Sequence, residues 1–177
     1  MLLRRWLKDC RGAMAAEFTL IAPLLLLVTV GIFETIFVIS DFQTASEATR
    51  RGARIALIGT PVATLNNVSN NVSVVCTGSN GGTDPNCTNG SLQAAAVFTN
   101  IVTAMQQIAP WLEPQNVRVT YAKSDIADES GLLTPLITVE IINANYEPKV
   151  TQSFSIDLAI PLPSFETTQL GPTIVLN

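Results

Sequence analysis

An apolar segment over residues 18–40 constrains this chain more than any other feature of its sequence. Residues 18–33 contain no charged side chain, and the whole segment contains only Glu34. At a rise of ~1.5 Å per residue, a helix of this length covers about 34 Å, which is enough to cross a hydrocarbon layer of ~30 Å. Pro23 removes one backbone hydrogen bond from such a helix, a loss that helices in a membrane tolerate. The segment therefore predicts a transmembrane helix.

Charge is distributed unevenly on the two sides of this segment. Residues 1–12 carry a net charge of +3, whereas residues 60–177 hold three basic and nine acidic side chains. A positive leader is expected to stay in the cytoplasm, which places the C-terminal domain outside it. The acidic domain lacks a basic patch and is therefore not expected to bind nucleic acid, because neutralising phosphates requires clustered Lys and Arg.

The residue types that are present argue against catalysis. The chain contains no histidine, which excludes Ser-His and Cys-His nucleophilic chemistry and His-ligated metal sites. The remaining Asp, Glu, Ser, Lys and Tyr side chains form no recognisable catalytic constellation. We therefore expect no enzyme activity, no cofactor and no metal site. Calcium binding by residues 77–90 is left as an open alternative, because this loop is rich in Asn and Asp but lacks the carboxylate spacing of a calcium loop.

The helical pattern continues past the apolar segment. We expect one helix over residues 13–59, with a transmembrane part at about 18–40 and an extracytoplasmic extension at 41–59. Small side chains recur at every fourth position of the extension, at Ala48, Gly52 and Ala56. Positions four apart share one helix face, and small residues there allow another element to approach closely. This stripe fits either a packing contact within the chain or a contact with another subunit.

Residues 60–177 predict an extracytoplasmic domain that contains a helix and several strands. The helix is expected to start at Ser91, a good N-cap residue, and to end at Pro110, because apolar residues recur between them at helical spacing. Strands are expected where apolar and polar residues alternate, at 68–75, 117–121, 137–141 and 154–160. The last two are expected to form an antiparallel hairpin around residues 147–149. Residues 77–90 predict a loop, and residues 174–176 predict an edge strand or a packed terminus.

Together these elements predict an α+β fold. A sheet with one apolar face needs a cover, and the second helix supplies an apolar face of its own. We therefore expect a long N-terminal transmembrane spine helix that carries a small antiparallel β-sheet domain covered by a second helix.

Two of the three cysteines fall in the predicted extracytoplasmic domain. Cys10 belongs to the basic leader, whereas Cys76 and Cys87 enclose ten residues of the domain. Outside the cytoplasm this pair is expected to oxidise, and the entropy of closing so short a loop gives the disulfide about 2.5–3 kcal/mol. The alternative is a pair of free thiols.

A glycine and a glutamate five residues apart precede the apolar segment. Gly12 ends the basic leader, and Glu17 is followed directly by Phe18. This arrangement resembles the cleavage site of type IV pilin-like precursors of the tight-adherence class. The stretches at 17–27, 31–34 and 48–54 are similar to the corresponding parts of TadE-like pseudopilins. The resemblance covers about residues 11–57, and several spaced features agree at once.

Conventional type IV pilins provide the nearest competing pattern. They have a phenylalanine directly after the cut and a glutamate at the fifth mature position. If Phe18 were the first mature residue, Glu17 would take the place of the glycine and Ala22 that of the glutamate. A cut after Gly12 instead makes Ala13 the first residue and Glu17 the fifth, so the tight-adherence pattern fits better.

The resemblance implies a minor pilin or pseudopilin of a tight-adherence type IV pilus, acting in pilus assembly or adhesion. A prepilin peptidase would cut it between Gly12 and Ala13, removing residues 1–12. Its partners would be that peptidase, other pilin and pseudopilin subunits, and the bacterial inner membrane before assembly into a pilus at the cell surface. The alternative is a signal-anchored extracytoplasmic binding domain that is never processed.

Two carboxylates in the helix are candidate functional groups. After cleavage, the new positive amine of Ala13 would lie one turn from Glu17, which could pair with it or with the amine of an adjacent subunit. The simpler interpretation is that Glu17 is favourable near a helix N-terminus at the membrane surface. Glu34 lies about 25 Å further along the axis, near the outer edge of the hydrocarbon. It would contact either a partner helix or the outer interface.

Overall fold

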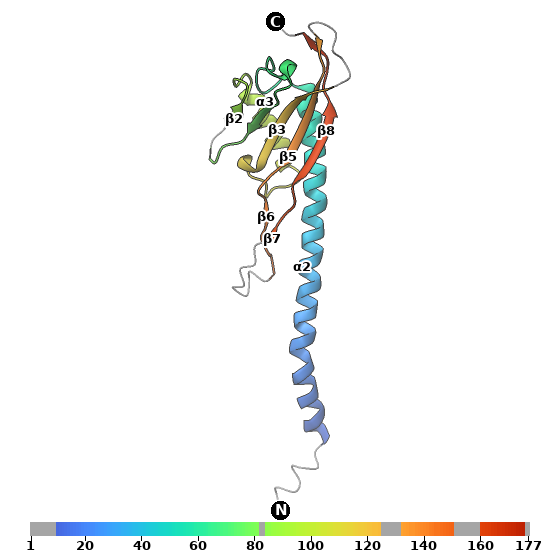
Figure 1. Cartoon of the computed structure of the whole chain (residues 1–177). Helices are drawn as coiled ribbons and strands as arrows, with labels where there is room; N and C mark the ends of the chain where they lie inside the picture. Colours follow the sequence, from blue (N-terminus) through green and yellow to red (C-terminus); the bar gives the residue numbers. More distant parts are fainter. Residues whose placement is uncertain (1–9, 82–83, 125–131, 151–159, 176–177) are drawn as a thin grey trace, which may run out of the picture. The chain divides into compact units, whose positions relative to one another are not determined.

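The computed structural model describes residues 10–81, 84–124, 132–150 and 160–175 (Figure 1). The chain divides into two units. The first combines Met1–Ile39 with Glu147–Ala159, and the second combines Ser40–Tyr146 with Ile160–Asn177. A long apolar helix, a five-stranded antiparallel sheet and a second helix confirm the predicted α+β class.

The long N-terminal helix, α2, spans Cys10–Ile58 and contains Pro23 in its interior. It ends where the sequence predicts, because the N–H of Gly59 donates to the carbonyl of Ile55 at 3.0 Å and Pro61 follows. From Met14 to Phe33 no side chain is buried. Among the described residues, α2 alone is long and apolar enough to cross a membrane. Its N-terminal part therefore fits a membrane anchor.

The five-stranded sheet belongs to the second unit and has the order β2-β1-β3-β5-β8, with every neighbouring pair antiparallel. Its strands are β1 Val74–Thr77, β2 Asn86–Thr88, β3 Val117–Lys123, β5 Pro135–Ile141 and β8 Phe165–Leu170. Period-2 alternation places one set of side chains on a single face. The register pairs Val119 with Val139 and Tyr121 with Ile137, and all four side chains are buried.

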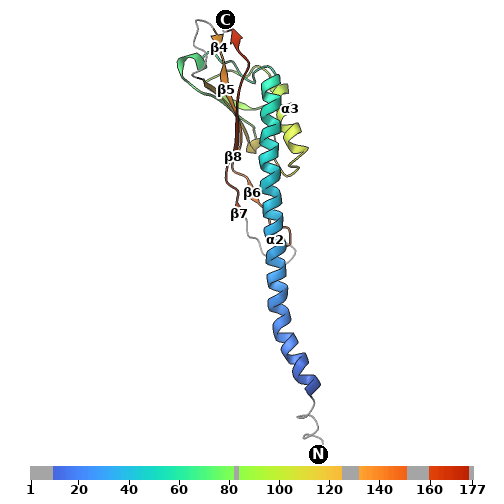
Figure 2. The same cartoon turned by 90° about the vertical axis from the view of Figure 1, so that its right-hand side faces the viewer.

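Helix α3, Ala95–Gln106, and the part of α2 after Ser40 lie together on this apolar face (Figure 2). Phe98, Ile101 and Met105 supply the buried face of α3. Two contacts tie α2 to the edge strand β8. The rings of Phe42 and Phe165 meet edge to face with centroids 4.7 Å apart, and the hydroxyls of Thr49 and Thr167 lie 3.0 Å apart.

Shorter elements surround the sheet. β4 Leu132–Leu133 pairs with β9 Ile174–Val175, and β6 Asn145–Tyr146 pairs with β7 Ile160–Pro161, both antiparallel. The expected edge strand at the tail is therefore present as β9. Two 3₁₀ turns, η1 Val68–Asn70 and η2 Pro114–Asn116, precede β1 and β3.

Three predictions about the middle of the chain are wrong in detail. The expected strand at 68–75 begins only at Val74, because η1 and a left-handed Asn71 (φ 64°) occupy its first half. The expected loop at 77–90 contains strand β2, which is short and polar and so gives no apolar alternation. Ser91 does not cap α3, whose first residue is Ala95. The carbonyl of Ser91 instead accepts a hydrogen bond from the N–H of Thr64 at 2.9 Å.

The expected hairpin between 137–141 and 154–160 is also wrong. Within the described residues, β5 has β3 and β8 as its neighbours. Residues 154–159 lie outside the described part of the chain, so only Ile160, in β7, can be compared. The sequence missed β8 because two of its inward positions are the polar residues Thr167 and Gln169, which face Val139 and Ile137 in register.

Candidate functional site

The predicted processing segment lies inside α2. The helix begins at Cys10, so the Gly12–Ala13 peptide bond and Glu17 belong to one continuous helical stretch. Glu17 is exposed, and Phe18 is 73% exposed. The large apolar side chains that follow are also exposed, and Leu20 is 80% exposed. An apolar surface of this extent marks a contact with lipid or with other helices.

Glu34 contacts another segment of its own unit. Its Oε1 accepts a hydrogen bond from the backbone N–H of Val150 at 2.6 Å. Next to this contact, Nζ of Lys149 lies 5.4 Å from the ring centroid of Phe37. Glu34 therefore contacts a loop of its own chain. This contact differs from the two that we expected, a partner helix or the outer membrane interface.

The small-residue stripe lies in the core of the second unit. Ala48, Gly52 and Ala56 are all buried. A Cβ added at Gly52 would meet Sδ of Met105 at 2.7 Å and Cγ1 of Val139 at 3.2 Å. Both helix α3 and strand β5 therefore approach the backbone of α2 here, which is close packing within the chain.

The basic residues of the α2 extension lie on its exposed side. Arg50, Arg51 and Arg54 are all exposed. The guanidinium of Arg51 donates to Oε1 of Gln107 at 3.0 Å, just beyond the end of α3. This bond joins α2 to the residue that follows α3, and the two helices also pack together at Gly52.

Cys76 and Cys87 form a disulfide, as predicted. Cys76 of β1 and Cys87 of β2 are directly opposite in the antiparallel register, with their Cα atoms 4.1 Å apart. Cys76 is buried and Cys87 half-buried. Because β2 has only three residues and ends the sheet, the covalent bond fixes an edge strand that contributes little apolar area.

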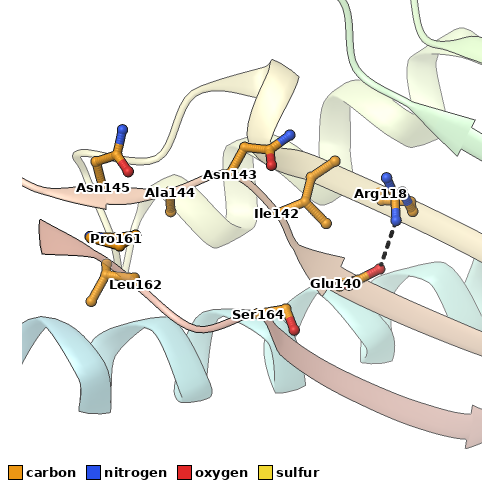
Figure 3. A pocket seen from close by; sticks show the side chains of 9 residues that line it. All are labelled: Arg118, Glu140, Ile142, Asn143, Ala144, Asn145, Pro161, Leu162 and Ser164. Carbon is orange, nitrogen blue, oxygen red and sulfur yellow. Dashed lines mark hydrogen bonds and ion pairs between the residues drawn. The ribbon is translucent and has the colours of Figure 1, made fainter.

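A polar pocket of about 570 Å³ opens at one end of the sheet (Figure 3). Arg118 of β3 and Glu140 of β5 point toward one another in it, with Nη1 3.3 Å from Oε2. Asn143, Asn145 and Ser164 supply further polar side chains to its lining. The ion pair balances its own charge, and amide and hydroxyl groups supply the other polar side chains of the lining. Among the described residues no three His, Cys, Asp or Glu side chains gather as a metal site.

Tyr121 is a buried polar residue that the sequence indicated only as part of an apolar alternation. Its hydroxyl oxygen accepts a hydrogen bond from the N–H of Val62 at 3.1 Å. Burial raises the pKa of the Tyr121 phenol above its ordinary value, and the bond from Val62 lowers it by less. The residue ties the segment after α2 to the centre of the sheet.

Tyr121→Phe is expected to lower the free energy of unfolding by about 1–2 kcal/mol at neutral pH, because it leaves the buried Val62 N–H without an acceptor. The unfolded chain releases its phenol proton near pH ~10, whereas the folded chain keeps this proton to higher pH. Stability from this group is therefore present below pH ~10 and falls as the pH rises further. Denaturant unfolding at neutral and alkaline pH tests this, since the variant should lose less stability on the alkaline side than the parent. An equal alkaline loss in both proteins would contradict the assignment.

The N-terminal part of this chain matches a known protein family. Residues 12–54 match the model of the TadE-like protein family. This segment is TadE-like. No curated protein and no solved structure matches the chain. The TadE-like family implies a structural protein associated with the tight-adherence pilus, and the apolar helix agrees with the membrane or surface association of such proteins.

The TadE-like match covers most of α2 and ends before the sheet and α3. It begins at Gly12 and includes Glu17, Glu34 and Gly52, but it ends before Ala56. The disulfide, the Arg118–Glu140 pair and Tyr121 all lie beyond it. Sequence reasoning missed the Arg118–Glu140 pair because a salt bridge between two strands depends on their register, which no local pattern reveals. It missed the hydrogen bond of Tyr121 because the donor is the backbone N–H of Val62, which has no side-chain signature.

Proposed function

We propose that this chain is a minor pilin or pseudopilin of a tight-adherence type IV pilus. A prepilin peptidase cuts it after Gly12, and the mature chain from Ala13 then acts in pilus assembly or adhesion. The observation that carries this proposal is the TadE-like match, which begins at the glycine of the predicted cleavage site. The offset of Glu17 from the future amine of Ala13 supports the same cleavage position.

Charge and cysteine chemistry support an orientation with the domain outside the cytoplasm. The leader over residues 1–12 carries a net charge of +3, and positive flanks stay on the cytoplasmic side. Disulfides persist in oxidising compartments, and the Cys76–Cys87 bond belongs to the domain on the other side of the apolar segment. The chain therefore lies in the inner membrane before assembly and belongs to the pilus or cell surface afterwards, with other pilin subunits as its partners.

The first test is the N-terminus of the chain in cells. Mass spectrometry of membrane-extracted protein is expected to find a mature chain that starts at Ala13 when an active prepilin peptidase is present. Cells without the peptidase should yield the chain from Met1, which serves as the control. An intact Met1 N-terminus in both strains would overturn the proposal and favour an unprocessed, signal-anchored binding domain.

A further inference from the structure

Strand β8 forms one edge of the five-stranded sheet, and half of its main-chain groups point away from that sheet. The N–H of Gly171 donates to the carbonyl of Pro135 at 2.7 Å, and the register of β8 with β5 places these two residues opposite each other. In an antiparallel pair, only every second residue of a strand exchanges hydrogen bonds with the same neighbour. Counting back from Gly171, the main-chain groups of three residues therefore point outward, at Glu166, Thr168 and Leu170.

These outward groups are open to a partner. β8 is the last strand of the sheet and lies at its margin, with β5 on its other side (Figure 1). Glu166, Thr168 and Leu170 are all exposed. Within the described part of the chain, no hydrogen bond reaches their N–H or C=O groups. Unpaired main-chain groups in a row are a template for a further strand.

β8 also lacks the features that block pairing at an edge. Proteins protect edge strands by making them short, by placing Lys or Pro in them, or by inserting a bulge. β8 has six residues, contains neither Lys nor Pro, and keeps an unbroken register with β5. The strand at the opposite edge, β2, has only three residues and is fixed to β1 by the disulfide. Of the two edges, β8 is therefore the one suited to strand addition.

The side chains beside the outward groups define the kind of strand that complements β8. The hydroxyl of Thr168 lies 2.8 Å from that of Thr138, so small polar side chains continue to the margin of the sheet. Glu166 has no ion-pair partner among the described residues, and a basic residue beside it is favourable. Leu170 is 43% exposed and favours an apolar neighbour. The complementary strand therefore carries a basic and an apolar side chain on one face, next to Glu166 and Leu170.

We propose that β8 is the docking site for an extended segment of another pilus subunit, which adds to the sheet as a further strand. The main-chain groups of Glu166, Thr168 and Leu170 supply the hydrogen bonds. In strand addition the main chain provides affinity, and alternate side chains provide selectivity. The site rests on the proposed function, since it requires the chain to be a pilus component, and it names the surface through which the chain contacts a neighbour.

Thr168→Pro tests this surface, because it removes an outward N–H and no hydrogen bond to β5. An edge strand tolerates proline where the missing N–H faces solvent. We expect the amount of this variant in sheared pili to fall at least about tenfold below that of the parent, since the incoming strand loses a donor. Thr168→Ala is the matched control: it loses the same contact with Thr138 but keeps the N–H, and should assemble like the parent. If Thr168→Pro assembles as well as Thr168→Ala, the docking site is wrong.

Hydrogen exchange of the parent chain gives an answer that does not depend on how well the proline variant folds. In detergent-extracted chain, the outward amides of β8 should exchange rapidly, whereas the amides of Thr167 and Gln169, which face β5, should exchange slowly. In sheared pili we expect exchange of the outward amides to slow at least about tenfold, because an added strand accepts their hydrogen bonds. Mass spectrometry with residue-level fragmentation measures both. Outward amides that exchange equally fast in both samples would overturn strand addition.

Failure of the proposed function gives a different result. If the parent chain is absent from sheared pili, the pilus role is overturned and the docking site with it. If the parent chain is present in pili while the outward amides of β8 still exchange rapidly, the docking site alone is overturned.

Discussion

Gly52→Leu is expected to lower the free energy of unfolding of the second unit by about 3 kcal/mol, at the upper end of the usual cost of overpacking. The added Cβ alone would lie 2.7 Å from Sδ and 2.9 Å from Cγ of Met105, and 3.2 Å from Cγ1 of Val139. Leucine gains ~1 kcal/mol over glycine from helix propensity, so a net loss means that close packing outweighs backbone preference. Denaturant unfolding of the full chain in detergent, followed by the fluorescence of Trp111 in a Trp6→Phe background, measures this change.

The same helix provides the control for this substitution. A Cβ at Gly31 would meet nothing within 4 Å, so Gly31→Leu makes the same chemical change without a clash. This variant should leave the free energy of unfolding of the second unit unchanged. A Met105→Ala substitution in the Gly52→Leu background removes the atoms that collide and is expected to recover part of the loss. Gly52→Leu with unchanged stability would mean that α3 does not approach α2 as described.

The helical half of the structure was predictable because its signals are local. An uncharged run, Gly59 and Pro61 at its end, and small residues at every fourth position each depend on neighbouring residues, and α2 follows them closely. The stripe at Gly52 could be identified as a packing surface from its spacing. Its packing partners, however, could not be predicted. They are Met105 of α3 and Val139 of β5, which lie far from Gly52 in the sequence.

The sheet shows where local patterns stop being informative. β3 and β5 alternate cleanly and are predictable, because every buried position in them carries an apolar or aromatic side chain. β8 and β2 lie at the two edges of the sheet and were missed. β8 meets α2 partly through the hydroxyls of Thr49 and Thr167, and β2 is joined to β1 by a disulfide. Edge strands held by polar and covalent contacts need little hydrophobic periodicity, so the sequence carries little trace of them.

Glu34 illustrates the same limit for a site residue. Its distance from Glu17 predicts its depth in a membrane, because helical rise is uniform. Its partner, the backbone N–H of Val150, is 116 positions away in the chain and carries no side-chain signature. No sequence motif identifies a main-chain donor of this kind, so the contact between Glu34 and the Val150 N–H is found only in the structure.

Glu17→Ala is expected to leave cleavage after Gly12 nearly intact while reducing incorporation into pili by at least about tenfold, which corresponds to ~1.4 kcal/mol. In the proposed mature chain the Ala13 amine is positive, and Glu17 follows it by one helical turn. Its carboxylate is available to neutralise that amine or the amine of an adjacent subunit. An unpaired amine held among the exposed apolar side chains of neighbouring α2 helices would cost several times this energy, since breaking a buried ion pair strands a charge.

Comparing sheared pili with the membrane fraction measures incorporation, and the mass of the N-terminal peptide measures cleavage. Glu47→Ala is the matched control, because it makes the same chemical change at an exposed carboxylate of the same helix. Glu17→Gln separates charge from shape: if it assembles as poorly as Glu17→Ala, the charge is what matters. Normal assembly of Glu17→Ala would mean that the amine finds its counter-charge elsewhere, and that Glu17 only favours the helix N-terminus at the membrane surface.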